Sequence, residues 1–555
     1  MRETINITME DGSVLQTKLN TAVSDLLPSE KSARGLYYIG ALINNEVSHL
    51  STQLESDAKV RFLDMTDAQG WRIYRSSATF LLSMAIEKLY DGKMFFSVEH
   101  SLGTGFFCRF GNDETCLTSS EIGRIEDCMR ELAEKKLPIQ PVKIPFEQAM
   151  LDFEKQHQKD KYKLLRFRNP AYININSCAE FSDLSHGVLA PHTGMIAPFK
   201  CIPHECGLII QFASQENAPE IAEFQHQPNL FNIFQEYKKW GRILGVRTAG
   251  DLNEVIADGN VANFIRIAEA LHEKKIGQLA DRITARKDDI KWIFMAGPSS
   301  SGKTTFAKRL AVQLKVNGLD SYLLSIDDFF VERDKTPRDE NGNLDFEDIE
   351  TVDIPFLHEH LGKLDRGEQV TLPRFDFTLG IRKFRDESFQ IGKHQIVIIE
   401  GIHGLNPRIW DVLPSEHIFK IYISALTQLS LDYHNRLSTT DNRLMRRIVR
   451  DHKFRGNHAI DTLRMWPSVR RGEKKWIFPY QKEADFTFNS ALDYEIPVLK
   501  MFLEPLLLEI KPYHEVYPTA RRLMEFSSNF LNIRASMVPP TSLLREFTGK
   551  SSFHY

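Results

Sequence analysis

Eight consecutive residues in the middle of the chain have the types and the order needed to hold the phosphates of a nucleotide. They are Gly297, Pro298, Ser299, Ser300, Ser301, Gly302, Lys303 and Thr304. Glycines let a loop turn so tightly that its backbone N–H groups surround a phosphate, at the positive end of the following helix. Lys303 would reach the β- and γ-phosphates, and the Thr304 hydroxyl would hold Mg²⁺. The pattern G-x-x-x-x-G-K-[ST] therefore predicts an ATP site, to which Thr305 also belongs.

Acidic residues follow two apolar segments further along the chain. Asp327 and Asp328 close the segment 322–326, and Glu400 closes the segment 395–399. The carboxyl ends of parallel strands face the ligand crevice, so these acids are expected beside the γ-phosphate. Glu400 would support the metal there. The structural alternative for each is a helix cap, a solvated turn or a plain edge acid.

A run of basic residues follows between positions 434 and 455. It contains Arg436, Arg443, Arg446, Arg447, Arg450, Lys453 and Arg455, against only two acids. Arg443, Arg447 and Arg450 share a face at helical spacing and could clamp a phosphate during its transfer. A solvated helix face is the alternative for such a run.

The residues between these motifs predict the fold that positions them. Apolar strand-like segments at 291–296, 322–326, 395–399, 418–423 and 486–488 alternate with helical patterns, among them the amphipathic segment 304–317. This order is typical of an α/β domain with a mostly parallel sheet and helices on both faces.

The first half of the chain predicts preceding α+β domains. An Asp11-Gly12 pair between two alternating runs indicates a hairpin, and we expect a small mixed sheet within residues 1–66. Residues 71–90 have helical spacing, and strand-like segments then recur up to about residue 212. Residues 216–288 read as a packed helical connector, because their apolar positions form one stripe. The stripe comprises Ile265, Ala268, His272, Ile276, Leu279 and Ile283.

Composition narrows the class of protein. A length of 555 residues suggests about three or four domains. The 42% apolar and 26% charged residues are those of an ordinary soluble protein, and a net charge of −4 argues against a generally nucleic-acid-binding surface. No apolar run is long enough to span a membrane, and the N-terminus lacks the apolar core of a signal peptide. We therefore expect a cytoplasmic protein without a membrane partner.

All six cysteines lie between Cys108 and Cys206. Reduced thiols are expected in the cytoplasm. The tightest cluster, Cys201, His204 and Cys206, could form half of a metal site, but no second Cys/His pair stands at zinc spacing elsewhere.

The motifs of residues 290–500 resemble those of the uridine kinase/phosphoribulokinase family. The matching segments are GPSSSGKTTF, SIDDFF, RFDFTLGIRK, IVIIEGIHG and RLMRRIVRDHKFRG. The resemblance implies that Asp327 is the general base for the acceptor hydroxyl. We expect it to have the ordinary pKa of an aspartate, about 4, and so to act mainly by orienting the hydroxyl. It places the Mg²⁺ ligands at Thr304 and Glu400. The phosphate-embracing arginines fall on Arg443, Arg447 and Arg450, and acceptor binding falls on Glu347, Phe375, Asp376, Arg382 and Arg447.

The sequence departs from this family where nucleosides are bound. Nucleoside-binding members carry Tyr-Asp-Phe and a histidine three residues on, whereas this chain has Phe375-Asp376-Phe377 and then Gly380. The family's Phe-Asp ribose contact appears as Phe346-Glu347, whose acid is one methylene longer. The resemblance thus implies phosphoryl transfer and leaves the acceptor open.

The front of the chain resembles threonyl-tRNA synthetase. Residues 1–66 resemble its β-grasp (TGS) domain, and residues 67–215 its editing domain, through IYRSS, FSDL and PHTG. The four metal-ligand positions of the editing family fall here on Ser76, Phe80, Ser185 and Leu189. Phenyl and isobutyl groups offer no lone pair, so no zinc is expected. His186 and His192 are expected to be surface or packing residues.

Three functions remain open at this point. The leading hypothesis is an ATP- and Mg²⁺-dependent kinase of a nucleoside such as uridine or cytidine; the second is a kinase of another sugar-like alcohol. The third is a nucleotide-driven regulator that binds RNA through its N-terminal half, although the guanine-reading Asn-Lys-x-Asp of translational GTPases is missing. We expect domains at 1–66, 67–215, 216–288 (the connector), 289–500 (the kinase) and 501–555 (a helical tail). The oligomeric state is not predicted.

Overall fold

The computed structural model describes residues 3–111, 116–340, 342–377 and 379–554. The chain forms two compact units, each assembled from three stretches of sequence. Unit 1 comprises Met1–Ala257, Gln428–Leu437 and Leu507–Leu531, and unit 2 comprises Asp258–Thr427, Ser438–Leu506 and Asn532–Tyr555. No helix of the described residues combines the length and the apolar character that crossing a bilayer requires.

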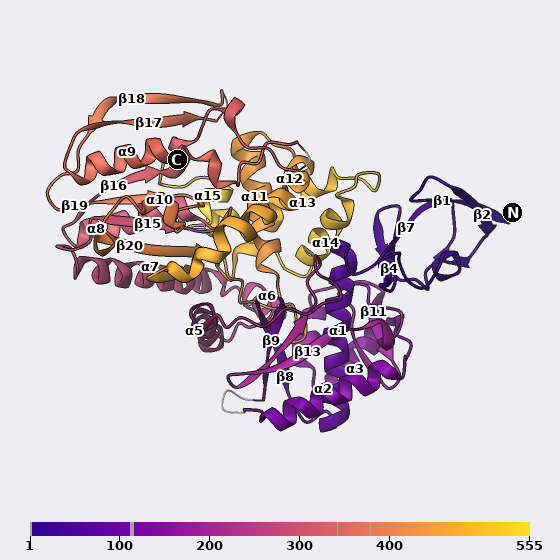
Figure 1. Ribbon diagram of the computed structural model, residues 1–555. Helices are drawn as coiled ribbons and strands as arrows, with labels where there is room; N and C mark the ends of the chain where they lie inside the picture. The colour runs from indigo at the N-terminus through magenta and orange to yellow at the C-terminus, as the bar shows by residue number, and fades with distance from the viewer. Residues whose placement is uncertain (1–2, 112–115, 341, 378, 555) are drawn as a thin grey trace. The chain divides into compact units, whose positions relative to one another are not determined.

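Unit 2 is built on a five-stranded parallel sheet, visible in Figure 1. Its strands, in spatial order, are β16 (Asp320–Ser325), β19 (Gln395–Glu400), β15 (Trp292–Ala296), β20 (Ile418–Ser424) and β21 (Phe486–Asn489). Every neighbouring pair runs parallel. The predicted α/β class with a parallel sheet is confirmed, and each strand lies within two residues of its predicted segment.

Alternate side chains of the central strand enter two separate cores. Ile293 and Met295 pack with two helices on one face, and Trp292 and Phe294 pack with a third helix on the other. This alternation is what a strand buried on both faces requires. The covering helices are α7 (Val261–Thr284) and α8 (Lys303–Val316) on the first face and α9 (Ile354–Asp365) on the second.

Unit 2 has further elements besides the sheet and its three covering helices. They are the hairpin β17 (Val370–Asp376) and β18 (Ile381–Phe389), the short α10 (Pro407–Trp410), and the helices α11 (Thr439–Arg455), α12 (Ala459–Gly472), α13 (Glu495–Leu508) and α15 (Arg545–Thr548). The predicted stripe on α7 is buried along its length, from Ile265 to Ile283.

Unit 1 contains the predicted hairpin and mixed sheet. The hairpin strands β1 (Thr4–Met9) and β2 (Val14–Lys18) are antiparallel, and β1 continues in parallel with β7 (Ala58–Leu63). Two further strands, β4 (Gly40–Ile43) and β5 (Glu46–Ser48), complete the sheet.

Beyond residue 66, the described part of unit 1 holds two more sheets and several helices. One sheet has the order β13 (Phe199–His204), β14 (Gly207–Phe212), β9 (Gly105–Phe110) and β8 (Phe96–Leu102); the other has the order β10 (Gln140–Pro145), β11 (Tyr172–Cys178) and β12 (Phe181–Leu184). The helices are α1 (Ala68–Tyr90), α2 (Ser119–Glu134), α3 (Phe146–Lys155), α4 (Lys159–Leu165), α5 (Pro228–Leu244), α6 (Ala249–Ala257) and α14 (Tyr517–Ser527).

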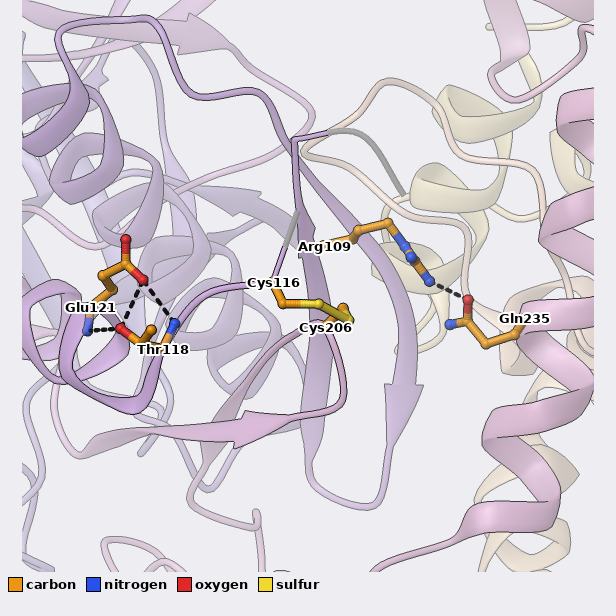
Figure 2. The surroundings of a disulfide bond; sticks show 6 residues. All are labelled: Arg109, Cys116, Thr118, Glu121, Cys206 and Gln235. Carbon is orange, nitrogen blue, oxygen red and sulfur yellow. Dashed lines mark hydrogen bonds between the residues drawn. A yellow bond between two sulfur atoms is a disulfide. The ribbon is translucent and has the colours of Figure 1, made fainter. Parts of the chain in front are cut away.

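One expectation about the cysteines is wrong. Cys116 and Cys206 form a disulfide next to the start of α2 (Figure 2), whereas we expected six reduced thiols. Spacing along the chain could not reveal the pair, because the partners are 90 residues apart. The same bond removes Cys206 from the candidate half-site with Cys201 and His204, since metals bind thiolates rather than disulfides.

Candidate active site

The phosphate loop joins β15 to α8, and its shape depends on two glycines. A Cβ atom at Gly297 would lie 2.1 Å from the backbone oxygen of Ile423, so no larger residue fits there. Gly302 has a φ of +87°, which lies in the left-handed region that glycine adopts without strain. α8 starts at Lys303, one residue before the predicted helix.

Two arginines of α11 hold carbonyl groups of this loop. Nη1 of Arg443 donates to the oxygen of Ser299, at 3.2 Å, and Nη1 of Arg446 donates to the oxygen of Ser300, at 3.3 Å. Both arginine side chains are buried, and each forms an ion pair with a buried carboxylate. The carboxylates belong to Glu473 and Glu495. These contacts fix the conformation in which a phosphate would meet the loop.

The first residues of α8 meet the end of β19. The hydroxyl of Thr304 donates to Oε1 of Glu400, at 3.1 Å, and Nζ of Lys303 donates to the oxygen of Gly297, at 2.9 Å. Hydroxyl and carboxylate oxygens are ligands that Mg²⁺ prefers. The two residues predicted to hold the metal thus lie in contact, and their donor set fits it.

Three acids around Lys303 have raised pKa values. Burial raises the pKa of Glu347 and that of Glu400 to about 7, although Arg447 and Lys303 act against the rise. Burial also raises the pKa of Asp327, again against Lys303. The expectation of an ordinary pKa for Asp327 is therefore wrong, because sequence alone does not show burial. A cation or a hydrogen-bond donor bound here would stabilise the charged form of these acids, and the charged acids would in turn strengthen its binding.

The two neighbouring aspartates after β16 differ in their contacts. Oδ1 of Asp328 accepts from the backbone N–H of Phe375, at 3.1 Å, and Oδ2 lies 3.3 Å from Nη2 of Arg385. Asp328 thereby holds the β17–β18 hairpin. Within the described part of the chain, the Asp327 carboxylate forms no hydrogen bond or ion pair, and only its backbone oxygen accepts a bond, from the N–H of Phe330. Its carboxylate remains available to a ligand.

The cationic side of the site is organised by one aspartate of α11. Asp451 pairs with Arg447 at 3.2 Å, with Arg450 at 2.7 Å and with Arg455 at 3.7 Å. These cations lower its pKa even though burial acts in the opposite direction. Nη1 of Arg447 also donates to the hydroxyl of Ser299, at 2.8 Å. Asp451 therefore positions the predicted phosphate-binding arginines against the loop.

Two of the predicted acceptor-binding residues have partners in or near the hairpin. Asp376 pairs with Lys383 at 2.7 Å. Nη2 of Arg382 lies 3.0 Å from Asp353 and 2.9 Å from the backbone oxygen of Phe330. Both residues support the hairpin, whereas Glu347 faces Arg447 at 3.9 Å, nearer the loop.

Sequence reasoning missed two acids of this region. Glu473 binds Arg443 at the end of α12, and Glu546 contacts the first turn of α8. Neither stands in a motif, and both come close to the loop only through folding of the chain. No local signal could have identified them.

The four positions that the resemblance to an editing domain aligns with metal ligands have other surroundings in the described structure. Ser76 is exposed on α1, and Phe80 is buried with its ring centroid 5.1 Å from that of Phe181. Leu189 is buried in the apolar core, and the Ser185 hydroxyl donates to the oxygen of Gly187.

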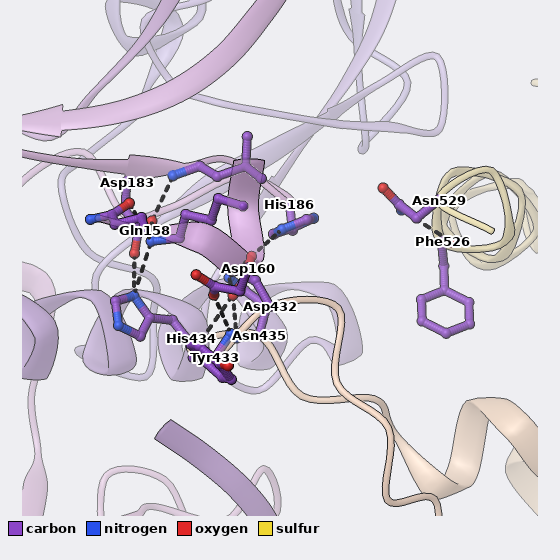
Figure 3. A network of polar contacts seen from close by, with 12 residues as sticks. Gln158, Asp160, Asp183, His186, Asp432, Tyr433, His434, Asn435, Phe526 and Asn529 are labelled. Atoms are coloured by element: carbon purple, nitrogen blue, oxygen red, sulfur yellow. Dashed lines mark hydrogen bonds and ion pairs between the residues drawn. The ribbon is translucent and has the colours of Figure 1, made fainter. Parts of the chain in front are cut away.

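A buried polar network lies beside Ser185 in unit 1 (Figure 3). Lys161 pairs with Asp183, which also lies 2.7 Å from Nδ1 of His434. Nε2 of His186 lies 2.7 Å from Asp432. His186 is thus half-buried and in hydrogen-bond contact with a buried carboxylate, a role that the expectation of a surface or packing histidine did not include. Asp432 and His434 come from the stretch Gln428–Leu437, and no motif along the chain places that stretch in this unit.

Comparison with known proteins gives different relatives for the two halves of the chain. Residues 292–497 match the model of the "Phosphoribulokinase / Uridine kinase family". The N-terminal half is similar to threonine–tRNA ligases. The ligase of Clostridium tetani is 27% identical over 200 residues, which are 36% of this chain and 31% of the relative; that of Bacillus subtilis is 28% identical over 203 residues, with the same coverage. The chain spans about a third of the length of these curated relatives.

Two solved structures are similar to part of the chain. A possible uridine kinase of Bacillus stearothermophilus is 21% identical, covering 39% of this chain and 98% of that one, with a TM-score of 0.28. D-glycerate 3-kinase of Cryptococcus neoformans is 16% identical, covering 46% of this chain and 87% of that one, with a TM-score of 0.23.

Proposed function

Since residues 292–497 match the phosphoribulokinase/uridine kinase family, we propose that this chain transfers the γ-phosphate of ATP to a hydroxyl of a small molecule. One observation carries the proposal. The phosphate loop leads into a helix whose Thr304 is hydrogen-bonded to Glu400, and Lys303 interacts electrostatically with three buried acids. A loop of this type alone would also suit a switch or a motor. A kinase also needs a group that accepts the proton of the acceptor hydroxyl. The Asp327 carboxylate, which has no hydrogen-bond or ion-pair partner in the described chain, can do this.

In the proposed reaction, the oxygen of the acceptor hydroxyl attacks the γ-phosphorus and the bond to the β-phosphate oxygen breaks. Asp327 orients the hydroxyl and takes its proton as the new bond forms. Its raised pKa makes it a better base than an ordinary aspartate. Lys303, Arg447 and Arg450 stabilise charge on the transferring group, and Arg443 holds the loop. Mg²⁺ held by Thr304 and Glu400 would neutralise phosphate charge.

We propose a nucleoside such as uridine or cytidine as the acceptor. Phe377 is 55% exposed, and its ring centroid lies 5.1 Å from that of Phe375 and 6.2 Å from that of Phe330. An exposed ring supported by two others can stack on a planar base. Glu347 would bind the ribose, because Oε2 has no hydrogen-bond partner in the described chain.

A different sugar-like alcohol is the second candidate, and one observation favours it. The base-reading histidine of nucleoside-binding relatives is replaced by Gly380, and a Cβ atom there would lie 2.7 Å from Nε of Arg333. Arg333 also donates to the backbone oxygen of Phe377. A guanidinium group beside the hairpin would suit an acceptor that carries oxygen atoms in place of a base.

The test is ATP turnover with a panel of nucleosides and of phosphate-free sugar alcohols. ADP formation that depends on one acceptor, with a phosphorylated product identified by mass spectrometry, is the expected result. Asp327→Asn should reduce the single-turnover rate by about 10²-fold or more while ATP affinity stays close to wild type. Asp328→Asn is the matched control. A larger loss for Asp328→Asn would mean that the base is assigned to the wrong aspartate.

For the N-terminal half, we propose that the region resembling an editing domain has kept that fold and lost the zinc ligands. We propose the domain boundaries 1–66, 67–215, 216–288, 289–500 and 501–555, and a cytoplasmic location where ATP is available. Elemental analysis of untagged protein should find no stoichiometric zinc, and mischarged tRNA should not be deacylated. About one zinc per chain would contradict this part.

RNA-stimulated ATP turnover without an acceptor would favour the regulator hypothesis instead.

A further inference from the structure

The last stretch of unit 2 places a carboxylate on the first turn of α8. Oε2 of Glu546 accepts hydrogen bonds from the backbone N–H of Thr305, at 3.2 Å, and from the Thr305 hydroxyl, at 2.7 Å. Thr305 directly follows the phosphate-loop motif. Backbone N–H groups at this turn are among those that cradle nucleotide phosphates in such loops. The carboxylate thus occupies an anion position of the nucleotide site.

Residues on both sides of Glu546 are firmly packed. Leu543, Leu544 and Phe547 are fully buried, and Leu543 belongs to the core that α7 and α8 form on the sheet. The guanidinium group of Arg446 lies 5.0 Å from the Phe547 ring centroid. The position of Glu546 over α8 is therefore fixed by its neighbours, and only its own side chain needs to rotate for Thr305 to be released.

The guanidinium group of Arg545 ties this stretch together. It donates to four backbone oxygens, those of Ala535, Val538, Pro539 and Gly549. A segment so closely bonded to itself presents the side chain of Glu546 as part of a built structure.

The charge of Glu546 also acts on the metal-binding side of the loop. The carboxylate of Glu546 interacts electrostatically with that of Glu400, which accepts a hydrogen bond from Thr304. A phosphate that arrives at α8 while Glu546 is in place meets like charge. Hydrogen bonds from the same donors cannot serve both anions.

We propose that Glu546 holds the place of a nucleotide phosphate on α8, so that a nucleotide binds only by displacing this carboxylate. The inference rests on the proposed function in one respect, that the loop binds a nucleotide. The resident carboxylate lowers nucleotide affinity and does so through the phosphates, not through the adenosine part. It makes the carboxyl-terminal stretch a built-in competitor of ATP.

Binding of ADP and of adenosine to the full chain, measured by calorimetry with Mg²⁺ present, tests the proposal. Glu546→Gln and Glu546→Ala should each bind ADP about tenfold more tightly than the wild type, because charged hydrogen bonds are about twice as strong as neutral ones. Adenosine affinity should not change. Glu509→Gln, an exposed glutamate outside the site, is the control and should match the wild type for both ligands.

Other outcomes would overturn the proposal. Unchanged or weaker ADP binding in both variants, with a wild-type unfolding midpoint, would show that Glu546 does not compete or that it helps to bind the nucleotide. An equal gain for adenosine would show that it acts on something other than phosphate. Tighter ADP binding without any phosphorylated acceptor would leave this inference intact and contradict the proposed function. No ADP binding by any variant would contradict both.

Discussion

Two buried clusters in this protein each place a lysine among acids, and they differ in how most of those acids are paired. Around Lys303 in unit 2, burial raises the pKa values of the neighbouring acids, two of them to about 7. Around Lys161 in unit 1, the pKa values of Asp183 and Asp432 are lowered although burial alone would raise them, and only Asp160 among these three acids has a pKa raised by burial. Cations of the protein itself cause that lowering, chiefly Lys161 for Asp183 and His186 for Asp432.

The difference lies in how completely the acids are paired. In unit 1, Asp183 and Asp432 each have a direct ion-pair partner, at 2.7 Å for the histidine pairs. In unit 2, Asp327 has no direct partner in the described chain, and Glu347 reaches Arg447 only at 3.9 Å. A cluster that satisfies its own charges contributes to stability, whereas one that leaves charges unsatisfied is prepared for a ligand. Matched substitutions in the two clusters can test this contrast.

The largest expected effect is the loss of phosphoryl transfer in Lys303→Met. Lys303 neutralises phosphate charge, and its removal should reduce turnover by about 10³-fold or more. The unfolding midpoint should stay close to wild type, because the surrounding acids can take up protons when their cation is lost. Acceptor-dependent ATP turnover and thermal unfolding are the measurements. Lys315→Met, at the exposed end of α8, is the control and should retain activity.

The same substitution in unit 1 should affect stability. Lys161→Met leaves the buried Asp183 with His434 as its remaining partner, and breaking a buried ion pair costs about 3–5 kcal/mol. Urea unfolding should show this loss in the transition of unit 1. Lys159→Met changes an exposed lysine on the same helix and should leave the transition within about 0.5 kcal/mol of wild type. Equal stability of the two variants would remove the contrast between the clusters.

The features that could be predicted from the sequence are those encoded by residues close to one another along the chain. The phosphate loop, Glu400 and the five strands of the parallel sheet are each encoded by neighbouring residues, through turn chemistry and apolar periodicity. The catalytic candidate Asp327 was identified by its place after a strand, but its raised pKa was not, because burial depends on distant segments.

Long-range contacts explain what the sequence did not reveal. Glu546 meets Thr305 across 241 positions, and His186 meets Asp432 across 246. Residues so far apart share no pattern along the chain. The buried polar network in unit 1 and the carboxylate on α8 could therefore be found only in the structure.

The smallest expected effect concerns the stability of the protein without ligands. The pKa of Glu347 is raised from 4.5 to about 7 in the folded protein, so the folded state binds more protons than the unfolded state between these values. Stability contributed by this group therefore falls as the pH rises from about 4.5 to about 7, by up to about 3 kcal/mol in total. Glu347→Gln removes the titration. Relative to wild type, the variant should gain up to about 3 kcal/mol between pH 5 and pH 8.

Urea unfolding of both proteins at pH 5, 6, 7 and 8 measures this gain. Glu387→Gln, at an exposed position of β18, should run parallel to wild type across the same range. Parallel profiles for Glu347→Gln and wild type would mean that this acid is already satisfied within the protein. The cluster around Lys303 would then resemble the one around Lys161. The measurement can be repeated with ADP and Mg²⁺ present. If the stability advantage of Glu347→Gln over the wild type then disappears, the ligand relieves the unsatisfied charge of Glu347, as a site prepared for binding requires.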